Sequence, residues 1–271
     1  MMGEMSFTHV VMMGIGGYSS AILMKVVGFP FCVTLPVGGI MAAAVAFILT
    51  FPLLRMKGFY FFIGSFAAGE VIRLIWGRFS FFGGYQGIFR IPKATLFGID
   101  VVDDLRIYYF VVLVVTLVSL WIMYRVEHSR IGMAIKAVAA YDLMAESVGI
   151  NLRYYKSLAF VIGSFFAGVS GVALLHRVGS IDPSQFVFTA NLFVIVCVLL
   201  GGTDRFAGSL IGLAVLTAIE QLISGIGDLE QWVPLVYGTL LILTMRFMPE
   251  GLLGLPNVLR KTFGNASSDF N

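Results

Sequence analysis

Charged, cysteine and histidine residues are scarce in this sequence of 271 residues. Asp, Glu, Lys and Arg make up 12% of the chain, whereas soluble domains contain about 25%. The two cysteines, Cys32 and Cys197, lie far apart in apolar surroundings and are predicted to be buried free thiols; no C-x-x-C motif occurs. The three histidines, His9, His128 and His176, lack metal-ligand spacing, so no metal site is predicted.

Apolar residues dominate instead. Hydrophobic types make up 59% of the chain, 25 residues are Phe, and the mean hydropathy is +0.94. The stretches Leu35–Leu54, Tyr108–Tyr124 and Leu158–Leu175 contain no charge, and a helix that crosses a bilayer needs about 20 mostly apolar residues. Barrel strands would alternate polar and apolar residues over about 10 positions. The sequence therefore predicts an all-α protein, a polytopic integral membrane helical bundle.

The predicted bundle has about eight membrane segments, with boundaries good to about 2–4 residues. The segments are Phe7–Val27, Leu35–Leu54, Phe59–Trp76, Tyr108–Tyr124, Leu158–Leu175, a short one near Phe186–Leu200, Phe206–Ile223 and Trp232–Met245. A long loop runs from Gly77 to Arg106, and a polar passage separates the fourth segment from the fifth.

Lys and Arg predict the orientation of these segments. If the segments alternate in direction, the loops on one side hold Arg55, Lys57, Arg125, Arg130, Lys136, Arg153, Lys156, Arg205, Arg246, Arg260 and Lys261. The loops on the other side hold only Lys25, Arg78, Arg90, Lys93, Arg106 and Arg177. The side richer in Lys and Arg is expected to be cytoplasmic. The net charge of +3 is therefore explained by loop orientation, and no nucleic-acid partner is predicted.

The polar passage, "AVAAYDLMAESVGINLRYYK" from Ala137 to Lys156, lies on the predicted cytoplasmic side. Asp142 is predicted to cap a short helix of about two turns, and Gly149 to end it in a left-handed conformation. Asn151 is a predicted N-cap for the helix that leads into the next membrane segment. A short helix lying along the membrane surface is suited to docking, and an ordinary solvated loop is the alternative interpretation.

The stretch "RIGMAIKAVAAYDLMAESVGINLRYYKSLAFVIGSFFAGVSGVAL", from Arg130 to Leu174, resembles the signature region of a permease family. These proteins are the M-type permease subunits of ABC importers for branched-chain and other hydrophobic amino acids. The resemblance implies that the cytoplasmic loop at about 125–157 is the coupling loop that docks on an ATPase subunit. The residues it assigns to that coupling are Ala134, Ala137, Ala140, Asp142, Ala145, Glu146, Gly149 and Ile150.

Four further stretches are similar to family patterns in the same order along the chain. They are "GEMSFTHVVMMGIGGYSSAIL", "LRMKGFYFFIGSFAAGEVIRLIW", "GGYQGI" and "LLGGTDRFAGSLIG". The family pattern also has further apolar helix before the first of these, and the sequence, which starts at Met1, holds almost nothing there. The resemblance implies that residues 1–271 form a single transmembrane permease domain.

The resemblance implies the partners and the location as well. It implies a second permease subunit, two cytoplasmic ATPase subunits that bind ATP and Mg, and an external solute-binding protein, all at a bacterial cytoplasmic (inner) membrane. The chain would bind no cofactor itself, because it lacks the G-x-x-x-x-G-K-[ST] motif that cradles ATP phosphates. It would be a non-catalytic subunit, since no catalytic constellation is visible. The expected substrates are branched-chain amino acids or related small polar solutes such as urea and amides.

Polar residues inside the predicted membrane segments are candidates for the translocation path. Glu70 and Arg73, spaced i and i+3, share one helix face, and charges at this depth usually face protein or a watery cavity. They either line the path or form a structural ion pair. Ser6, Thr8 and His9 either mark a helix break that binds substrate or cap the first helix. An ion-gradient-driven secondary transporter, with Glu70 or Glu220 as proton carrier, is the alternative function.

Overall fold

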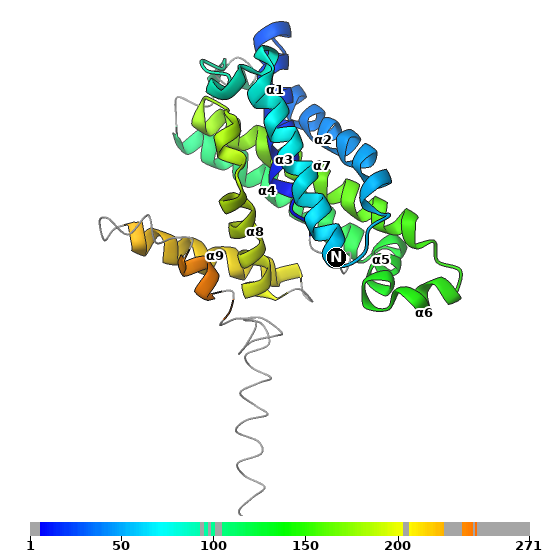
Figure 1. Ribbon diagram of the computed structural model, residues 1–271. Helices are drawn as coiled ribbons and strands as arrows, with labels where there is room; N and C mark the ends of the chain where they lie inside the picture. The colour runs from blue at the N-terminus through cyan, green and yellow to red at the C-terminus, as the bar shows by residue number, and fades with distance from the viewer. Residues whose placement is uncertain are drawn as a thin grey trace, which may run out of the picture. The chain divides into compact units, whose positions relative to one another are not determined.

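The computed structural model describes residues 6–92, 95–96, 99–100, 105–202, 206–224, 235–240 and 242, which are mostly helical (Figure 1). The helices are α1 (His9–Ile22), which continues as a π-helical turn over Leu23–Val27, α2 (Phe31–Leu53), α3 (Phe59–Arg78), α4 (Leu105–Glu127), α5 (Arg130–Ala140), α6 (Asp142–Ser147), α7 (Leu152–Val178), α8 (Phe188–Gly201) and α9 (Phe206–Ser224). Short 3-10 turns cover Ser80–Phe82, Gly84–Gln86 and Pro183–Phe186. Strands β1 (Thr95–Leu96) and β2 (Ile99–Asp100) pair antiparallel, with Thr95 opposite Asp100.

Within the described residues, five helical stretches are long and apolar enough to cross a membrane, which confirms the predicted multi-pass helical bundle. They are His9–Val27, Phe31–Leu53, Phe59–Arg78, Arg106–Glu127 and Leu152–Val178, and shorter apolar helices cover Phe188–Gly201 and Gly208–Leu222. Most of the last predicted segment, Trp232–Met245, lies outside the described residues. Several helices run past the predicted segments, because Arg125, Glu127 and Arg153 continue the hydrogen-bonded helix beyond its apolar part.

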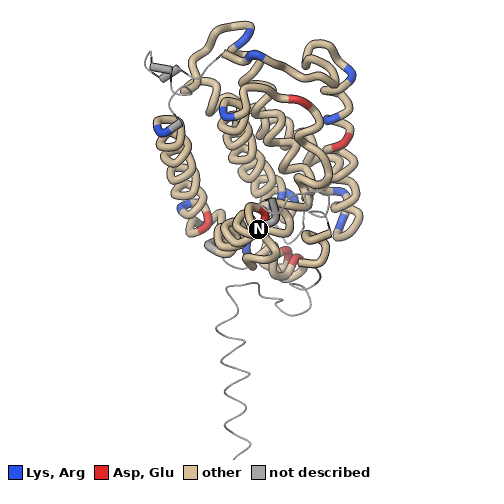
Figure 2. Tube along the Cα trace, turned by 90° about the vertical axis from the view of Figure 1, so that its left-hand side faces the viewer, with Lys and Arg blue, Asp and Glu red and all other residues tan. Residues whose placement is uncertain are grey.

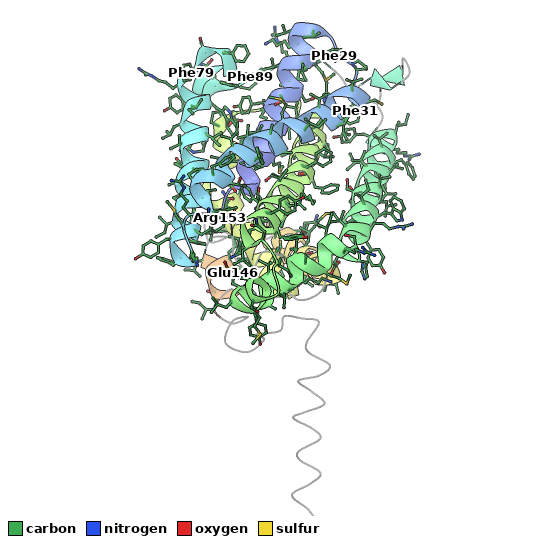
Figure 3. The ribbon with its side chains drawn as sticks, turned by 90° about the vertical axis from the view of Figure 1, so that its right-hand side faces the viewer. Phe29, Phe31, Phe79, Phe89, Glu146 and Arg153 are labelled. Atoms are coloured by element: carbon green, nitrogen blue, oxygen red, sulfur yellow. The ribbon has the colours of Figure 1, made fainter. Side chains whose placement is uncertain are left out.

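Contacts within the chain define two compact units, Met1–Val187 and Phe188–Asn271. In the first unit, α1, α2 and α7 pack against one another and form the core. Figure 3 shows Phe29, Phe31, Phe79 and Phe89 at one end of this unit. Glu146 and Arg153 lie at the other end (Figure 3), so the polar passage and the Gly77–Arg106 loop belong to opposite ends, as the alternating segments predict.

Glycines allow α1, α2 and α7 to approach closely. A Cβ atom on Gly16 would overlap the backbone of Gly168, and one on Gly171 would overlap the carbonyl oxygen of Met13. A Cβ on Gly38 would lie 3.0 Å from the carbonyl oxygen of Gly16. Membrane helices associate through such small residues because lipid provides no hydrophobic drive between them. Gly168 and Gly171 therefore serve the close packing of α7 against α2 and α1.

An aromatic cluster closes the end of the first unit that carries the Gly77–Arg106 loop. The ring of Tyr18 lies 4.7 Å from that of Trp76 and 5.8 Å from that of Phe82, and Trp76 lies 5.5 Å from Phe186. Above it, the Ile88 N–H donates to the Ile181 carbonyl at 2.8 Å, and the Ile181 N–H donates back at 3.0 Å. This bridge fastens the loop to the segment that follows α7.

Helix α4 is the least buried of the five long helices. Only 6% of the most apolar stretch of α4 is buried, compared with 61% of the corresponding stretch in the helix that includes α1. Tyr109, Phe110 and Trp121 are all exposed, and the charges of α4 lie near its two ends (Figure 2). Such a helix needs apolar surroundings along most of its surface.

The second unit is built on α8 and α9. A Cβ on Gly212 would overlap the carbonyl oxygen of Cys197, so these helices also meet at a glycine. Val196, Cys197, Leu216 and Tyr237 form its buried cluster. Cys197 is buried as predicted, whereas Cys32 is exposed, because it lies on a face of α2 that no described element covers.

Candidate functional site

The segment between the membrane helices α4 and α7, which contains most of the polar passage, folds into two helices, α5 and α6. Helix α5 begins after Ser129, whose Oγ accepts a hydrogen bond from the Gly132 N–H at 3.3 Å. Its residues Ile135 and Val138 are buried. The helix ends at Ala140 because Tyr141 is extended, with φ −149°. The predicted order of helix, stop, short helix, glycine stop and helix is confirmed.

Asp142 does not cap α6, so that prediction is wrong. Tyr141 occupies the N-cap position without a side-chain capping bond, and Asp142 is the first residue of the helix. The Oδ2 atom of Asp142 accepts a hydrogen bond from Lys156 Nζ at 2.9 Å. The ammonium group of Lys156 is largely buried, so leaving it without an anionic partner would cost more than leaving a backbone N–H of α6 uncapped. The Asp142 carboxylate still stabilises α6, because it lies in the first turn of the helix.

Gly149 ends α6 as predicted. Its φ is +83°, in the left-handed region. The Gly149 N–H donates to the Glu146 carbonyl at 3.0 Å, and the Ile150 N–H donates to the Ala145 carbonyl at 3.0 Å. These two bonds define a Schellman motif. The N-cap prediction for Asn151 is also confirmed, because its Oδ1 accepts from the Tyr154 N–H at 3.2 Å.

Helix α6 turns an apolar surface outward. Leu143 is 83% exposed, Met144 67% and Val148 74%, whereas Ala145 is 4% exposed and faces inward. Glu146 is exposed on the same short helix and lies, with Arg153, at one end of the first unit (Figure 3). We call Leu143, Met144 and Val148 the α6 surface. Large apolar side chains on a polar segment at a helix-bundle end are typical of a docking surface.

The other residues assigned to coupling gather around this helix. On α5, Ala137 and Ala140 are exposed and Ala134 is partly buried. Ile150 is partly buried in the turn before α7. Helix α5 packs against both α6 and α7. The structure therefore brings the predicted coupling residues together at one end of the first unit, and their role in coupling stays a prediction.

Glu70 and Arg73 form an ion pair on α3. Arg73 Nε donates to Glu70 Oε1 at 3.0 Å and to Oε2 at 2.9 Å, and Arg73 Nη2 also contacts Oε1. Their side chains are 34% and 21% exposed, respectively. The shared helix face predicted from the i, i+3 spacing is therefore confirmed. The pairing agrees with the structural interpretation, and a part in the translocation path stays a prediction.

Ser6, Thr8 and His9 form the turn that starts α1. Thr8 is at the N-cap position, but its side chain makes no capping bond. Instead its hydroxyl lies 2.7 Å from that of Ser6, and the ring of His9 packs edge-on against that of Phe160 at 5.8 Å. A Cβ on Gly163 would lie 3.1 Å from His9 Nε2. The Thr8 side chain therefore does not cap α1, the turn contacts α7, and a part of these residues in the translocation path stays a prediction.

Two polar contacts could not be found from sequence periodicity. Tyr237 donates from its hydroxyl to Glu220 Oε1 at 3.1 Å, so Glu220 has a hydrogen-bond partner within its own unit. The Ser20 hydroxyl lies 3.4 Å from Nε2 of the buried His176. Both contacts join residues on different helical segments, so no short-range sequence pattern predicts them. Within the described part of the chain, no three His, Cys, Asp or Glu side chains are placed to hold a metal ion.

Comparison with known proteins adds to this geometry. The family model described as "Branched-chain amino acid transport system / permease component" matches residues 1–245. The permease protein LivM of the high-affinity branched-chain amino acid transport system of Escherichia coli K12 is 32% identical over 262 residues, which covers 88% of this chain and 61% of LivM. The permease protein LivH of the same kind of system in Salmonella typhimurium is 37% identical over 133 residues, covering 49% of this chain and 42% of LivH.

A third relative is the branched-chain amino acid permease protein BraD of Pseudomonas aeruginosa. It is 32% identical over 173 residues, covering 64% of this chain and 54% of BraD. The chain thus spans about three fifths of the length of LivM, the curated relative that it covers most fully among these three. No solved structure matches the chain.

Proposed function

Because the chain belongs to the family of branched-chain amino acid transport system permease components, we propose that it is the membrane-spanning permease subunit of an ATP-driven importer. The chain is a multi-pass helical membrane protein, and the proposed location is the bacterial inner membrane. It would form the pathway for solute while separate subunits bind and hydrolyse ATP. The non-catalytic role is supported by the family, whose described activity is transport.

The observation that carries this proposal is the α6 surface. Leu143 and Met144 are exposed on a six-residue helix that lies between two long membrane helices in the sequence, and Val148, the residue that follows this helix, is exposed as well. A soluble ATPase could bury these side chains in a pocket, because apolar anchors in a pocket dominate interface energies. Closure of the ATPase pair on ATP would then move α6, and hydrolysis would reset it. ATP and Mg would be bound by the ATPase subunits.

The proposed substrates are branched-chain amino acids or related small polar solutes such as urea and amides. The printed names of LivM, LivH and BraD support the amino acids first. Selectivity would rest largely with an external solute-binding protein. The end of the first unit opposite α6 offers it exposed aromatic side chains on a fastened loop: Phe79, Phe81, Tyr85 and Phe89.

The second permease subunit would be a related chain. LivM covers 88% of this chain, and LivH, a permease protein of the same kind of system, resembles half of it. Two such related chains would enclose the pathway between them. An ion-gradient-driven transporter is not favoured, because the family supports ATP-driven import, Glu70 is paired with Arg73, and Glu220 accepts from Tyr237.

The test of this function is the association of ATPase subunits with the α6 surface. A Leu143→Ala, Met144→Ala double variant should lose about 1 kcal/mol or more of binding free energy per anchor side chain, so the ATPase should no longer co-purify. Leu117→Ala on α4 is the matched control, because Leu117 is also exposed but lies outside the polar passage. Normal co-purification and normal leucine uptake in the double variant would remove α6 from the docking site.

A further inference from the structure

An ion pair joins the short helix α6 to the long helix α7. Lys156, in the second turn of α7, donates from Nζ to Oδ2 of Asp142, the first residue of α6, at 2.9 Å. The Lys156 side chain is 10% exposed and that of Asp142 is 40% exposed. The contact therefore has a nearly buried cation on the side of the bundle and a carboxylate that reaches it from the docking helix.

The peptide connection between the same two helices passes through open space. Gly149, in its left-handed conformation, has no atom within 4 Å of the position that a Cβ would take. The α6 surface points away from the bundle, and Ala145 contributes only a methyl group to the inward contact. A displacement of α6 could be absorbed by rotation about Gly149 unless another contact holds α6 against α7.

Helix α7 is fixed within the bundle. Its Gly168 and Gly171 meet the backbones of α2 and α1 with no room for a side chain. At the α6 end, the Ser157 hydroxyl donates to Thr50 Oγ1 of α2 at 3.3 Å. Closely packed helices move as rigid elements, so a displacement delivered at Lys156 reaches α1 and α2 through α7.

We propose that the Asp142–Lys156 ion pair is the contact that makes α7 follow α6, so that movement of the docked helix displaces the α1–α2–α7 bundle as one body. This inference rests on the proposed function, since it assumes that an ATPase docks on α6. Asp142 and Lys156 are positioning residues: they carry displacement between the docking surface and the pathway, and they contact neither ATP nor solute. The pair resists separation, because the Lys156 ammonium is almost desolvated and would be left as an uncompensated buried charge without Asp142.

The experiment compares leucine uptake per ATP hydrolysed in vesicles that contain the assembled complex with its binding protein. Asp142→Asn keeps the shape of the side chain and removes its charge. We expect it to lower uptake per ATP by about 2- to 30-fold, while the ATPase still co-purifies and the amount of inserted protein is unchanged. The exchanged pair Asp142→Lys, Lys156→Asp keeps both charges and their summed side-chain length, and should restore much of the uptake per ATP.

The control is a different ion pair, between Lys136 Nζ and Glu127 Oε1 at 2.8 Å. It joins α5 to the end of α4 and does not involve α6. Lys136→Met should leave uptake per ATP within about twofold of the unaltered protein.

Three results would overturn the proposal: unchanged uptake per ATP in Asp142→Asn, an exchanged pair that restores nothing, or ATPase co-purification that falls in parallel with uptake. The last would mean that the pair shapes the docking site only. Failure of the proposed function is distinguishable, because it would appear in the Leu143→Ala, Met144→Ala variant, which leaves this ion pair intact.

Discussion

The α1–α2–α7 bundle and the α6 turn both depend on glycine, but for different physical reasons. In the bundle, Gly16, Gly168 and Gly171 stand where a Cβ would overlap the backbone of a neighbouring helix. At the end of α6, Gly149 has open space around it and needs glycine for its φ of +83°. Loss of the first kind should therefore separate packed helices, whereas loss of the second should misdirect a surface helix and leave the bundle intact.

The largest effect is expected from Gly171→Ala. The new methyl group would overlap the carbonyl oxygen of Met13, so α1 and α7 must move apart, at a cost of about 3 kcal/mol. The thermal midpoint and the yield of detergent-extracted protein should fall sharply. Gly238→Ala is the matched control, since a Cβ there meets nothing within 4 Å. Equal midpoints for the two variants would contradict the close packing of α1 and α7.

A smaller loss of stability is expected from Glu70→Gln. This variant leaves the Arg73 guanidinium without its anionic partner at membrane depth, which should cost about 2–3 kcal/mol. The double variant Glu70→Gln, Arg73→Gln removes both charges and should recover most of the yield if the pair is structural. Recovery of yield without uptake would instead place the two residues in transport. A double variant with normal yield and normal uptake would leave them no part in the translocation path.

Gly149→Val should act on docking alone. A β-branched residue in the left-handed region costs about 1–2 kcal/mol, enough to disturb the Schellman motif but not the bundle. ATPase co-purification and uptake should fall while membrane insertion and the thermal midpoint persist. Gly149→Asn is the matched control, because Asn tolerates the left-handed conformation. This variant should keep both ATPase co-purification and uptake. If the thermal midpoint of Gly149→Val fell as far as that of Gly171→Ala, the two kinds of glycine would not differ in the way proposed.

The smallest perturbation tests on which side of the membrane α6 lies. In a Cys32→Ser, Cys197→Ala background, the single cysteine of Ser147→Cys should react with membrane-impermeant thiol reagents from the cytoplasmic side only. One at Tyr85, which is 69% exposed at the opposite end of the first unit, should react only from outside. Neither substitution should change uptake measurably. Reversed labelling would overturn the orientation predicted from Lys and Arg.

Much of the fold followed from local pattern. The uncharged stretches located α2, α4 and α7 because run length and apolarity alone decide whether a helix can cross a bilayer. The ends of α6 and α7 were visible at Gly149 and Asn151, since a left-handed turn and an N-cap depend on residues within a few positions. The family also followed from motif order, and the match over residues 1–245 supports it.

Side-chain partners were harder to predict. Asp142 was expected to cap α6 and instead pairs with Lys156, which is 14 positions away. Glu220, a candidate proton carrier, accepts a hydrogen bond from Tyr237, which is 17 positions away. Both partners lie on other helices, where no local rule indicates them, and the pairing prevails because a charged or polar group in a low-dielectric region is stabilised most by a direct hydrogen bond.

Composition and spacing were thus enough to indicate a multi-pass helical membrane protein with a glycine-ended helix between two membrane helices, and the resemblance of its motifs indicated the permease family. They could not show which face of each helix is covered, and hence that Gly171 meets Met13, that Cys32 is exposed, or that Lys156 holds Asp142. Apolar runs and backbone preferences can be recognised in one continuous stretch of sequence, because they depend only on residues that follow one another in the chain. Contacts between helices depend on how those helices lie against one another, so they emerge only when the whole bundle is assembled.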